Sequence, residues 1–148
     1  MRQQIEPDEQ QIAERVAAGM FARDSASQSL GIQVKEVRPG YARLTLIVRP
    51  DMLNGHAICH GGIVFSLADS AFAFACNSRN QNTVASGGSI DFLAPAKTGD
   101  ELSAEAVERA LLGRIGVYDV TVTNQEGRTI ALFRGRSYRV TGEVIASS

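Results

Sequence analysis

Apolar and polar positions alternate with two different periods along the chain. Residues 8–23 carry apolar side chains at helical spacing and few β-branched residues, which predicts an amphipathic helix. Residues 31–48 change to a two-residue period and are interrupted by Arg-Pro-Gly at 38–40, which predicts an antiparallel hairpin. We therefore expect the helix to pack at one edge of a sheet that begins with this hairpin.

The longest apolar run lies in the middle of the chain, at residues 61–76, and contains one charged residue, Asp69. It is shorter than the roughly 20 residues that a membrane-spanning helix needs, so it predicts a buried helix that starts at about Gly62. Extended segments follow, and Asn-Gln-Glu-Gly at 124–127 is typical of a hairpin turn between the last two. These segments are residues 83–94, 101–109, 115–123 and 129–140.

The segment 100–112 is ambiguous, because Ala, Glu and Leu favour a helix while its apolar residues alternate as in a half-buried strand. Its extended neighbours favour the strand. The order of elements then predicts an α+β fold, in which an antiparallel five- to six-stranded sheet wraps around a long central helix. We expect residues 1–148 to form a single domain, with an N-terminal helix at about 8–23 and a core at about 30–141.

The charge balance narrows the classes of partner. The chain has 148 residues, and Lys and Arg number 15 against 16 acidic residues. A nearly neutral chain has no overall field that attracts nucleic acid or a membrane surface, so we expect neither as a partner. Two cysteines and a polar start without an apolar signal-type segment predict a cytoplasmic protein with free thiols.

The central stretch "NGHAICHGGIVFSLADSAFAFACNS", residues 54–78, raises the question of why a carboxylate sits among small apolar residues. Helical spacing puts Asp69 on one stripe with Ser66, Ser70 and Ala73. A stripe that faces water is one explanation, but an ordinary exposed face would carry Lys, Glu and Arg. Small residues indicate close packing, and a desolvated carboxylate has a pKa suited to base or nucleophilic chemistry.

Residues His60, Gly61 and Gly62 lead into the predicted helix. The N–H groups of a first helical turn are free, and glycine lets a ligand carbonyl approach the backbone closely. Gly61 is therefore a candidate donor to a developing oxyanion. A tight turn from strand to helix is the alternative explanation of the two glycines, and the two explanations are compatible.

Other chemistries find less support in the sequence. Zinc ligation by His56, Cys59, His60 and Cys76 lacks a recognisable ligand spacing, so we expect no metal. A serine hydrolase would need a nucleophile elbow of the G-x-S-x-G kind, which is missing. The sequence also lacks a P-loop and a dinucleotide-binding glycine motif.

The quoted stretch, extended to "MLNGHAICHGGIVFSLADSAFAFACNS", resembles the signature of the hotdog-fold acyl-CoA thioesterases, in particular the PaaI type of phenylacetate degradation. The resemblance continues through "VASGGSIDFLAPAKTGDELSAEA", "GVYDVTV" and "ALFRGRSYR", from about residue 30 to 139. A lone His-Gly-Gly would be weak evidence for this family. The set Asn54, His60, Gly61 and Asp69, spaced by 6, 1 and 8 positions, is specific.

The resemblance implies a homodimer with active sites at the subunit interface, and a tetramer formed from two dimers. It implies that the Gly61 amide polarises the thioester carbonyl, that Asn54 places the carbonyl or water, and that His60 steadies the loop. Asp69 then attacks the carbonyl or activates the attacking water, two roles that the sequence leaves open. By the same resemblance the substrate-binding surface includes Gly62, Ser70 and Ala73, and no cofactor is needed beyond the coenzyme A moiety of the substrate.

Three further residues are predicted to contact the substrate. Some relatives carry a hydroxyl side chain that faces the acyl group, and Ser86 fits this position only if the register slips by one from Ala85. The phosphates of coenzyme A need basic partners, and alternation puts Arg134 and Arg136 on one strand face. An exposed edge with ion pairs is the alternative for these arginines.

The predicted function is hydrolysis of (hydroxy)phenylacetyl-CoA-like aryl or acyl-CoA thioesters to free acid and CoA, in aromatic degradation. A non-catalytic hotdog module that binds acyl-CoA is the alternative from a different class. The intact set of Asn54, Gly61 and Asp69 argues against it. A dehydratase is the enzymatic alternative, although that branch would be expected to present His and Asp in a different motif.

Overall fold

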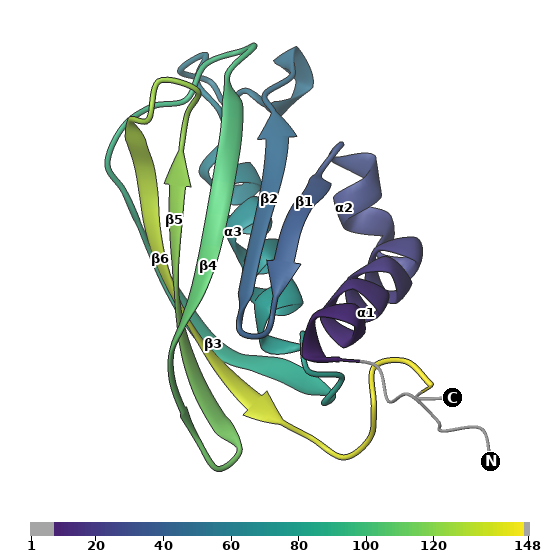
Figure 1. Cartoon of the computed structure of the whole chain (residues 1–148). Coiled ribbons are helices and arrows are strands. Elements are labelled where there is room, and N and C mark those ends of the chain that lie inside the picture. The colour runs from purple at the N-terminus through teal and green to yellow at the C-terminus, as the bar shows by residue number, and fades with distance from the viewer. Residues whose placement is uncertain (1–7, 147–148) are drawn as a thin grey trace, which may run out of the picture.

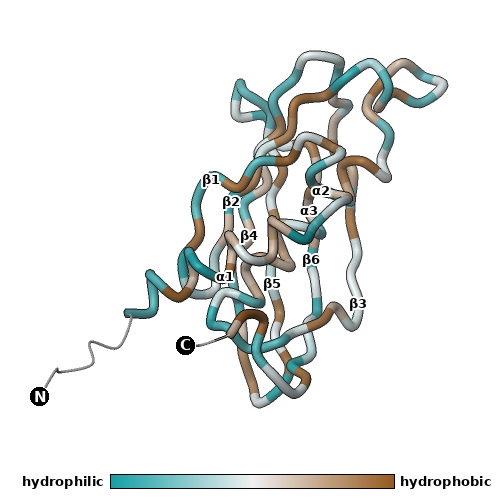
Figure 2. Tube along the Cα trace, turned by 90° about the vertical axis from the view of Figure 1, so that its right-hand side faces the viewer, coloured by the Kyte–Doolittle hydropathy of each residue, from teal (hydrophilic) through white to brown (hydrophobic). Residues whose placement is uncertain are grey.

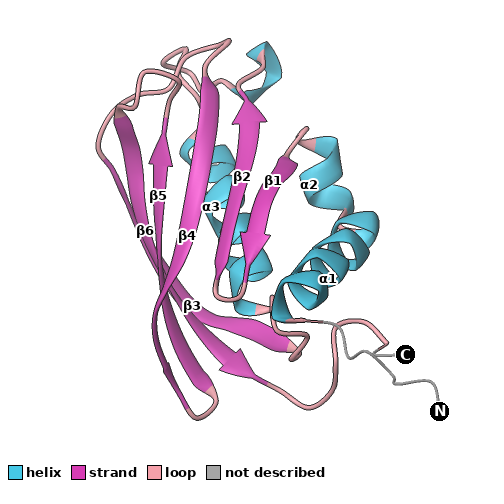
Figure 3. Cartoon of the chain, in the orientation of Figure 1, coloured by secondary structure: helices cyan, strands magenta, loops and turns pink. Residues whose placement is uncertain are grey.

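The computed structural model describes residues 8–146 and shows one six-stranded antiparallel sheet with three α-helices (Figures 1 and 3). The helices are α1 (Glu9–Arg23), α2 (Ser25–Ser29) and α3 (Gly61–Cys76), with a short 3-10 helix η1 (Pro50–Met52). The strands are β1 (Gln33–Arg38), β2 (Tyr41–Ile47), β3 (Thr83–Phe92), β4 (Glu101–Leu112), β5 (Ile115–Thr123) and β6 (Thr129–Arg139). Their order in the sheet is β1-β2-β4-β5-β6-β3.

The sheet curves around α3, which packs on its inner face (Figure 1). Alanines on the buried side of α3 let the helix approach the strands closely, and Phe72 fills the space beside Tyr118 of β5 with ring centroids 5.5 Å apart. Each large apolar side chain buried in this way stabilises the fold by roughly 1.5–3 kcal/mol. The core therefore lies between α3 and the sheet, as the apolar run predicts.

The predicted elements are confirmed with small changes at their ends. The ambiguous segment 100–112 forms strand β4. It pairs with β2 on one side and with β5 on the other, and its alternating apolar residues suit a strand in this position. Helix α1 begins after Asp8, whose carboxylate accepts a hydrogen bond from the Gln11 N–H. Helix α3 begins at Gly61 rather than Gly62, because His60 serves as its N-cap. No helix within residues 8–146 is long and apolar enough to cross a bilayer.

The two edges of the sheet differ. Edge strand β1 is covered by α1, and the Gln10 side chain donates a hydrogen bond to the Val37 carbonyl at 2.8 Å. Edge strand β3 lies at the opposite margin (Figure 2), and most of its side chains are exposed. It carries Gly87 and Gly88 in its middle, and glycine in a strand often marks a place where another backbone approaches closely.

Candidate functional site

The loop before α3 is held in shape by Asn54. Its side-chain oxygen accepts hydrogen bonds from the N–H groups of His56 at 2.9 Å and Ile58 at 3.4 Å. The Asn54 N–H donates to the Ile58 carbonyl at 2.9 Å, and Ala57 adopts a φ of 58°. The loop is thus a preformed turn, and within residues 8–146 the Asn54 Nδ2 group has no acceptor.

His60 selects which glycine amide is free. Its Nδ1 accepts a hydrogen bond from the Gly62 N–H at 2.9 Å, while its own N–H donates to the Met52 carbonyl at 2.8 Å. The Gly61 N–H opens the helix, so it has no acceptor inside α3, and no other acceptor binds it in the described part of the chain. The Gly61 amide, which the sequence predicts to be the oxyanion donor, is therefore the one without a hydrogen-bond acceptor in the described residues.

Asn54 and Gly61 line the same apolar cavity, of about 460 Å³. The Phe92 ring covers Gly61, since a Cβ atom added to this glycine would lie 3.0 Å from the ring. Phe92 is itself 53% exposed, so the mouth of the cavity is apolar and open. The remaining lining residues are Ile58, Cys59, Val64, Leu93, Ala94, Pro95, Ala96 and Ile130.

Asp69 stands apart from this cavity. It lies eight residues after Gly61, which corresponds to about 12 Å along the helix axis. Its carboxylate is partly buried and accepts no hydrogen bond from residues 8–146. Burial raises the pKa of the Asp69 carboxyl, and the negative charge of Asp24 raises it further. The structure therefore gives a carboxylate that is unpaired and more basic than an ordinary aspartate.

The other members of the predicted stripe have different surroundings. Ser70 turns toward α2, where its hydroxyl lies 2.9 Å from the hydroxyl of the buried Ser27. Ser66 donates a hydrogen bond to the Gly62 carbonyl at 2.8 Å, and Ala73 is half-buried. The face of α3 turned away from the sheet thus presents small groups around Asp69.

Ser86 lies at an irregularity in β3. The pairing of β3 with β6 shifts register between Ala85 and Gly87, so Ser86 is the residue left without a partner. Its hydroxyl donates to the Arg136 carbonyl at 3.3 Å, and its side chain is exposed. Ser86 therefore lies at a bulge of β3, and its predicted contact with the acyl group stays a prediction.

The two predicted arginines lie on the outer face of the sheet, as alternation along β6 predicts. Arg134 is bound to Asp119 through two hydrogen bonds of 2.7 and 2.9 Å, and Arg109 adds a third of 3.0 Å. These donors hold the pKa of the Asp119 carboxyl below its usual range, although partial burial opposes them. The ion-pair alternative thus describes Arg134, and neither arginine lies in the cavity of Asn54 and Gly61.

The sequence pattern did not identify the apolar wall of the site. Phe92, Leu93 and Pro95 come from the end of β3 and the connection to β4, and in the sequence they are indistinguishable from core residues. It also missed Asp24, the N-cap of α2, whose charge acts on Asp69 only in the folded chain. A turn residue far from the motif carries no sign of such proximity.

The cysteines show no sign of nucleophilic activation. Burial raises the pKa of the Cys76 thiol to about 12, and it also raises the pKa of the buried Cys59 thiol. Both cysteines are free, and residues 8–146 contain no group of three His, Cys, Asp or Glu side chains that could hold a metal ion.

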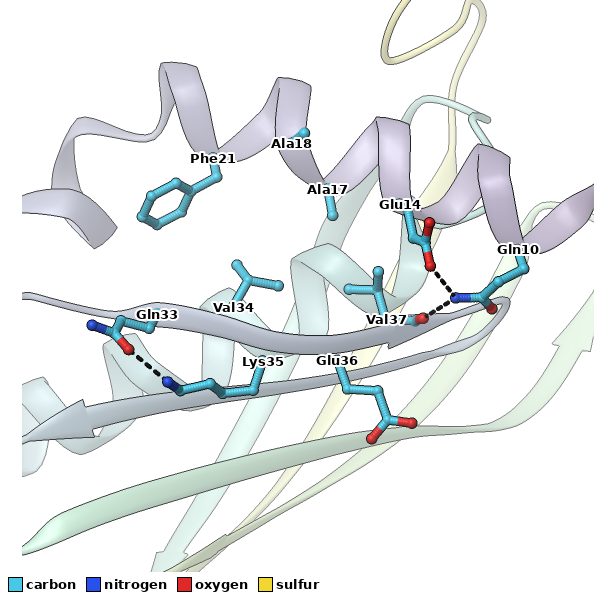
Figure 4. Close-up of a pocket in the computed structure, with 10 residues that line it drawn as sticks. All are labelled: Gln10, Glu14, Ala17, Ala18, Phe21, Gln33, Val34, Lys35, Glu36 and Val37. Carbon is cyan, nitrogen blue, oxygen red and sulfur yellow. Dashed lines mark hydrogen bonds between the residues drawn. The ribbon is translucent and has the colours of Figure 1, made fainter. Parts of the chain in front are cut away.

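A larger groove, of about 590 Å³, lies between α1 and β1 (Figure 4). Gln10 spans it, donating to Glu14 at 3.1 Å and to the Val37 carbonyl. Its walls mix apolar and charged side chains and include none of the residues that the motif proposes. Size alone therefore does not locate the candidate site.

Comparison with known proteins identifies the family of this chain. The family model "Thioesterase superfamily" matches residues 56–131. The acyl-coenzyme A thioesterase PaaI of Escherichia coli is 47% identical over 128 residues, which is 86% of this chain and 91% of that protein. The structure of E. coli PaaI, from the phenylacetic acid degradation operon, superimposes with a TM-score of 0.90 at 45% identity, covering 92% of this chain and 99% of that one.

Two more distant structures share the fold. A mutant of the phenylacetic acid degradation protein PaaI from Thermus thermophilus gives a TM-score of 0.74 at 38% identity, covering 77% of this chain and 97% of that chain. A hypothetical thioesterase from Streptococcus pneumoniae, solved with coenzyme A, gives 0.72 at 28% identity, with 76% and 90% covered. The chain therefore belongs to the thioesterase superfamily and has its hotdog fold.

Proposed function

We propose that this protein is an acyl-CoA thioesterase that hydrolyses (hydroxy)phenylacetyl-CoA and similar aryl or acyl-CoA thioesters, in the cytoplasm, as a step of aromatic degradation. Its similarity to E. coli PaaI supports the activity and the pathway. The apolar cavity beside Gly61 supports an aryl or alkyl acyl group, because it offers many carbon contacts and few polar ones.

The observation that carries the proposal is the free Gly61 amide at the mouth of this cavity. An N–H group at a helix N-terminus is oriented by the backbone and favours negative charge. A thioester carbonyl that accepts from Gly61 would gain negative charge as it is attacked, so the interaction strengthens toward the transition state. Asn54 Nδ2, without an acceptor in the described residues, would bind the same oxygen or the attacking water.

The reaction also needs Asp69, and this requirement predicts a dimer. Reacting atoms must come within about 3–3.5 Å, whereas Gly61 and Asp69 of one chain are separated by about 12 Å along α3. A second copy with α3 in the opposite direction would bring its own Asp69 to the Gly61 amide. Each active site would then combine two subunits.

The exposed strand β3 is the edge that would join the two copies. Its side chains are mostly exposed, and Gly87 and Gly88 would allow close approach of a second β3. Antiparallel pairing about a twofold axis near these glycines would continue the sheet and place the two α3 helices side by side. Pairs of such dimers would form the tetramer.

The chemistry follows from these groups. If Asp69 is a general base, it takes a proton from water while the water oxygen bonds to the carbonyl carbon, and the carbon–sulfur bond then breaks to give acid and CoA thiol. If it is a nucleophile, its carboxylate attacks first, and water hydrolyses the resulting anhydride after the thiolate leaves. His60 holds the loop through Gly62, and Gly62 and Ala73 leave room for the substrate beside Asp69. We also include Ser70 in this substrate-binding surface, although its hydroxyl contacts Ser27 of α2.

The predicted contacts to coenzyme A divide between the remaining residues. Arg136 has no carboxylate partner at ion-pair distance among residues 8–146, so it is the better of the two predicted arginines for a phosphate. Arg134 is held by Asp119 and would act only after that pair opens. Ser86, exposed at the irregularity in β3, would face the acyl group of a substrate bound between two copies.

Thiol release from a panel of acyl-CoAs, followed with a colorimetric thiol reagent, tests the proposal. We expect the highest kcat/KM for phenylacetyl-CoA and its hydroxylated forms, with lower values for short aliphatic thioesters. Tight binding of these thioesters without release of thiol would instead identify a binding module. Hydration of an enoyl-CoA without thiol release would identify the dehydratase alternative.

A further inference from the structure

The contact between α2 and α3 brings a second carboxylate toward Asp69. Asp24 caps α2 and accepts two hydrogen bonds from Ser27, at 3.0 Å from its N–H and at 2.6 Å from its hydroxyl. The Ser27 hydroxyl lies 2.9 Å from that of Ser70, which follows Asp69 on α3. Because Ser27 gives its only hydroxyl proton to Asp24, Ser70 must donate to Ser27.

This chain of hydrogen bonds is buried at its centre. Ser27 is 2% exposed, although α2 is only five residues long and serine is usually a surface residue. A buried hydroxyl needs partners, and Asp24 and Ser70 supply one on each side. The chain therefore fixes the short helix α2 against the middle of α3.

Asp69 has no other acidic neighbour with a comparable effect. Burial, and after it the negative charge of Asp69, raises the pKa of the Cys76 thiol on the same helix. Tyr118 of β5 packs against Phe72 and donates a hydrogen bond to Glu108. Glu108 of β4 also faces inward, but it accepts hydrogen bonds from Tyr118 at 2.9 Å and from Arg79 at 2.6 Å. Arg23 donates to the Gly19 and Val144 carbonyls. Asp24 is the charged group whose field raises the pKa of Asp69, in addition to burial.

We propose that Asp24 is a positioning residue for Asp69: through Ser27 and Ser70 it holds α2 against the middle of α3, and its negative charge acts on the Asp69 carboxylate. This inference rests on the proposed role of Asp69. The charge of Asp24 keeps Asp69 a stronger base or nucleophile than it would be beside a neutral cap, because ionising a second carboxylate nearby costs more. Asp24 itself does not touch the substrate.

Asp24→Asn separates the charge from the hydrogen bonds. The amide oxygen still accepts from the Ser27 N–H, and the amide nitrogen donates to the Ser27 hydroxyl, which then donates to Ser70. We expect kcat at neutral pH to fall by about two- to fivefold, and the acid limb of kcat/KM to move to lower pH. Asp119→Asn removes the same charge from the outer face of the sheet and is the matched control, with no shift of the limb expected.

The ¹³C carboxyl shift of Asp69, followed against pH and assigned by comparison with Asp69→Asn, gives a readout that does not require turnover. We expect its titration to move to lower pH in Asp24→Asn but not in Asp119→Asn. An unchanged Asp69 titration in a folded Asp24→Asn protein would overturn the inference. If Asp24→Asn does not fold, Asp24→Ser keeps a helix cap without the charge and takes its place in both measurements.

The two proposals fail in different ways. If Asp69→Asn retains wild-type thiol release, the proposed function of Asp69 is wrong, while a shifted Asp69 titration in Asp24→Asn would still show the electrostatic coupling. If Asp69→Asn is inactive but the titration and the acid limb are both unmoved by loss of the Asp24 charge, only the positioning role is wrong.

Discussion

Two partly buried aspartates, on opposite sides of the sheet, have opposite environments. Asp119, on the outer face, accepts hydrogen bonds from Arg134 and Arg109, which lower the pKa of its carboxyl. Asp69, on the exposed face of α3, accepts none within residues 8–146, and burial raises the pKa of its carboxyl. The Asp119 carboxylate is stabilised as an anion by its hydrogen bonds, whereas the Asp69 carboxylate has no hydrogen-bond donor among residues 8–146.

The difference separates a structural charge from a chemical one. An ion pair on a sheet face orders side chains and leaves the carboxylate weakly basic. An unpaired, partly desolvated carboxylate costs stability, and proteins keep such groups mainly where chemistry requires them. The comparison therefore supports the proposed chemical role of Asp69 and a structural role for Asp119, and each experiment tests one of these roles.

The largest expected effect is on turnover. Asp69→Asn should fold and assemble but lose roughly 10²- to 10⁴-fold in kcat, the range for loss of a positioned base, while KM changes much less. Asp119→Asn should keep kcat within about twofold of wild type, because Asp119 lies on the outer face of the sheet and not in the cavity of Asn54 and Gly61. Steady-state thiol release for the two variants measures both. Comparable losses in the two variants, or none in Asp69→Asn, would remove the distinction.

A mixing experiment asks whether Asp69 acts across the proposed dimer interface. Asp69→Asn and Asn54→Ala each inactivate every site of their own homodimer. A hybrid dimer with shared sites has one site that carries both changes and one that carries neither, so statistical mixing should restore about a quarter of wild-type activity. The measurement is thiol release after subunit exchange, with exchange itself checked by mass spectrometry. Full exchange without recovery would contradict the shared geometry.

A smaller effect is expected at the amide end of the site. Gly61→Ala should lower kcat by about ten- to a hundredfold, because the methyl group hinders approach of a carbonyl to the helix N-terminus. The structure adds a second cause, since that methyl would lie 3.0 Å from the Phe92 ring. The double variant with Phe92→Ala separates the two causes in the thiol-release assay, with Phe92→Ala alone as its control.

If hindrance at the amide is the cause, the double variant stays as slow as Gly61→Ala. Recovery to the rate of Phe92→Ala would show instead that contact with the ring explains the loss, and that Gly61 is needed for packing rather than for the oxyanion.

The fold could be predicted from the sequence because the spacing of apolar residues in each element matches the side of that element that packs against the core. The apolar run of α3 and the alternation of β5 and β6 are each matched by the side that the structure buries. Even the ambiguous segment of β4 was decided correctly by its neighbours, since a strand between two strands satisfies its backbone hydrogen bonds on both sides.

The site was harder to predict than the fold, because several of its residues are far apart in the sequence and come together only in the folded chain. The motif identified Asn54, His60 and Gly61, which are close in the sequence, and local hydrogen bonds explain their arrangement. It gave no sign of Phe92 at the cavity mouth or of Asp24 near Asp69, because those contacts depend on how the end of β3 and helix α2 pack. The partner of Arg134 was likewise invisible, since Asp119 lies on a neighbouring strand.

The smallest effect, and the one with opposite signs for the two aspartates, is on stability. A carboxyl whose pKa is raised in the folded state destabilises it once pH rises above the unfolded value, so Asp69→Asn should raise Tm at neutral pH by up to about 3 °C. A carboxyl whose pKa is lowered stabilises the fold above the unfolded pKa, so Asp119→Asn should lower Tm by about 2 °C. Both differences in Tm should shrink as acid protonates the wild-type carboxylates, and the difference for Asp119 should do so at the lower pH.

Thermal unfolding of wild type, Asp69→Asn and Asp119→Asn from neutral to acidic pH measures these differences. Tm shifts of the same sign in the two variants would mean that the contrast between paired and unpaired carboxylates does not govern the stability of the protein.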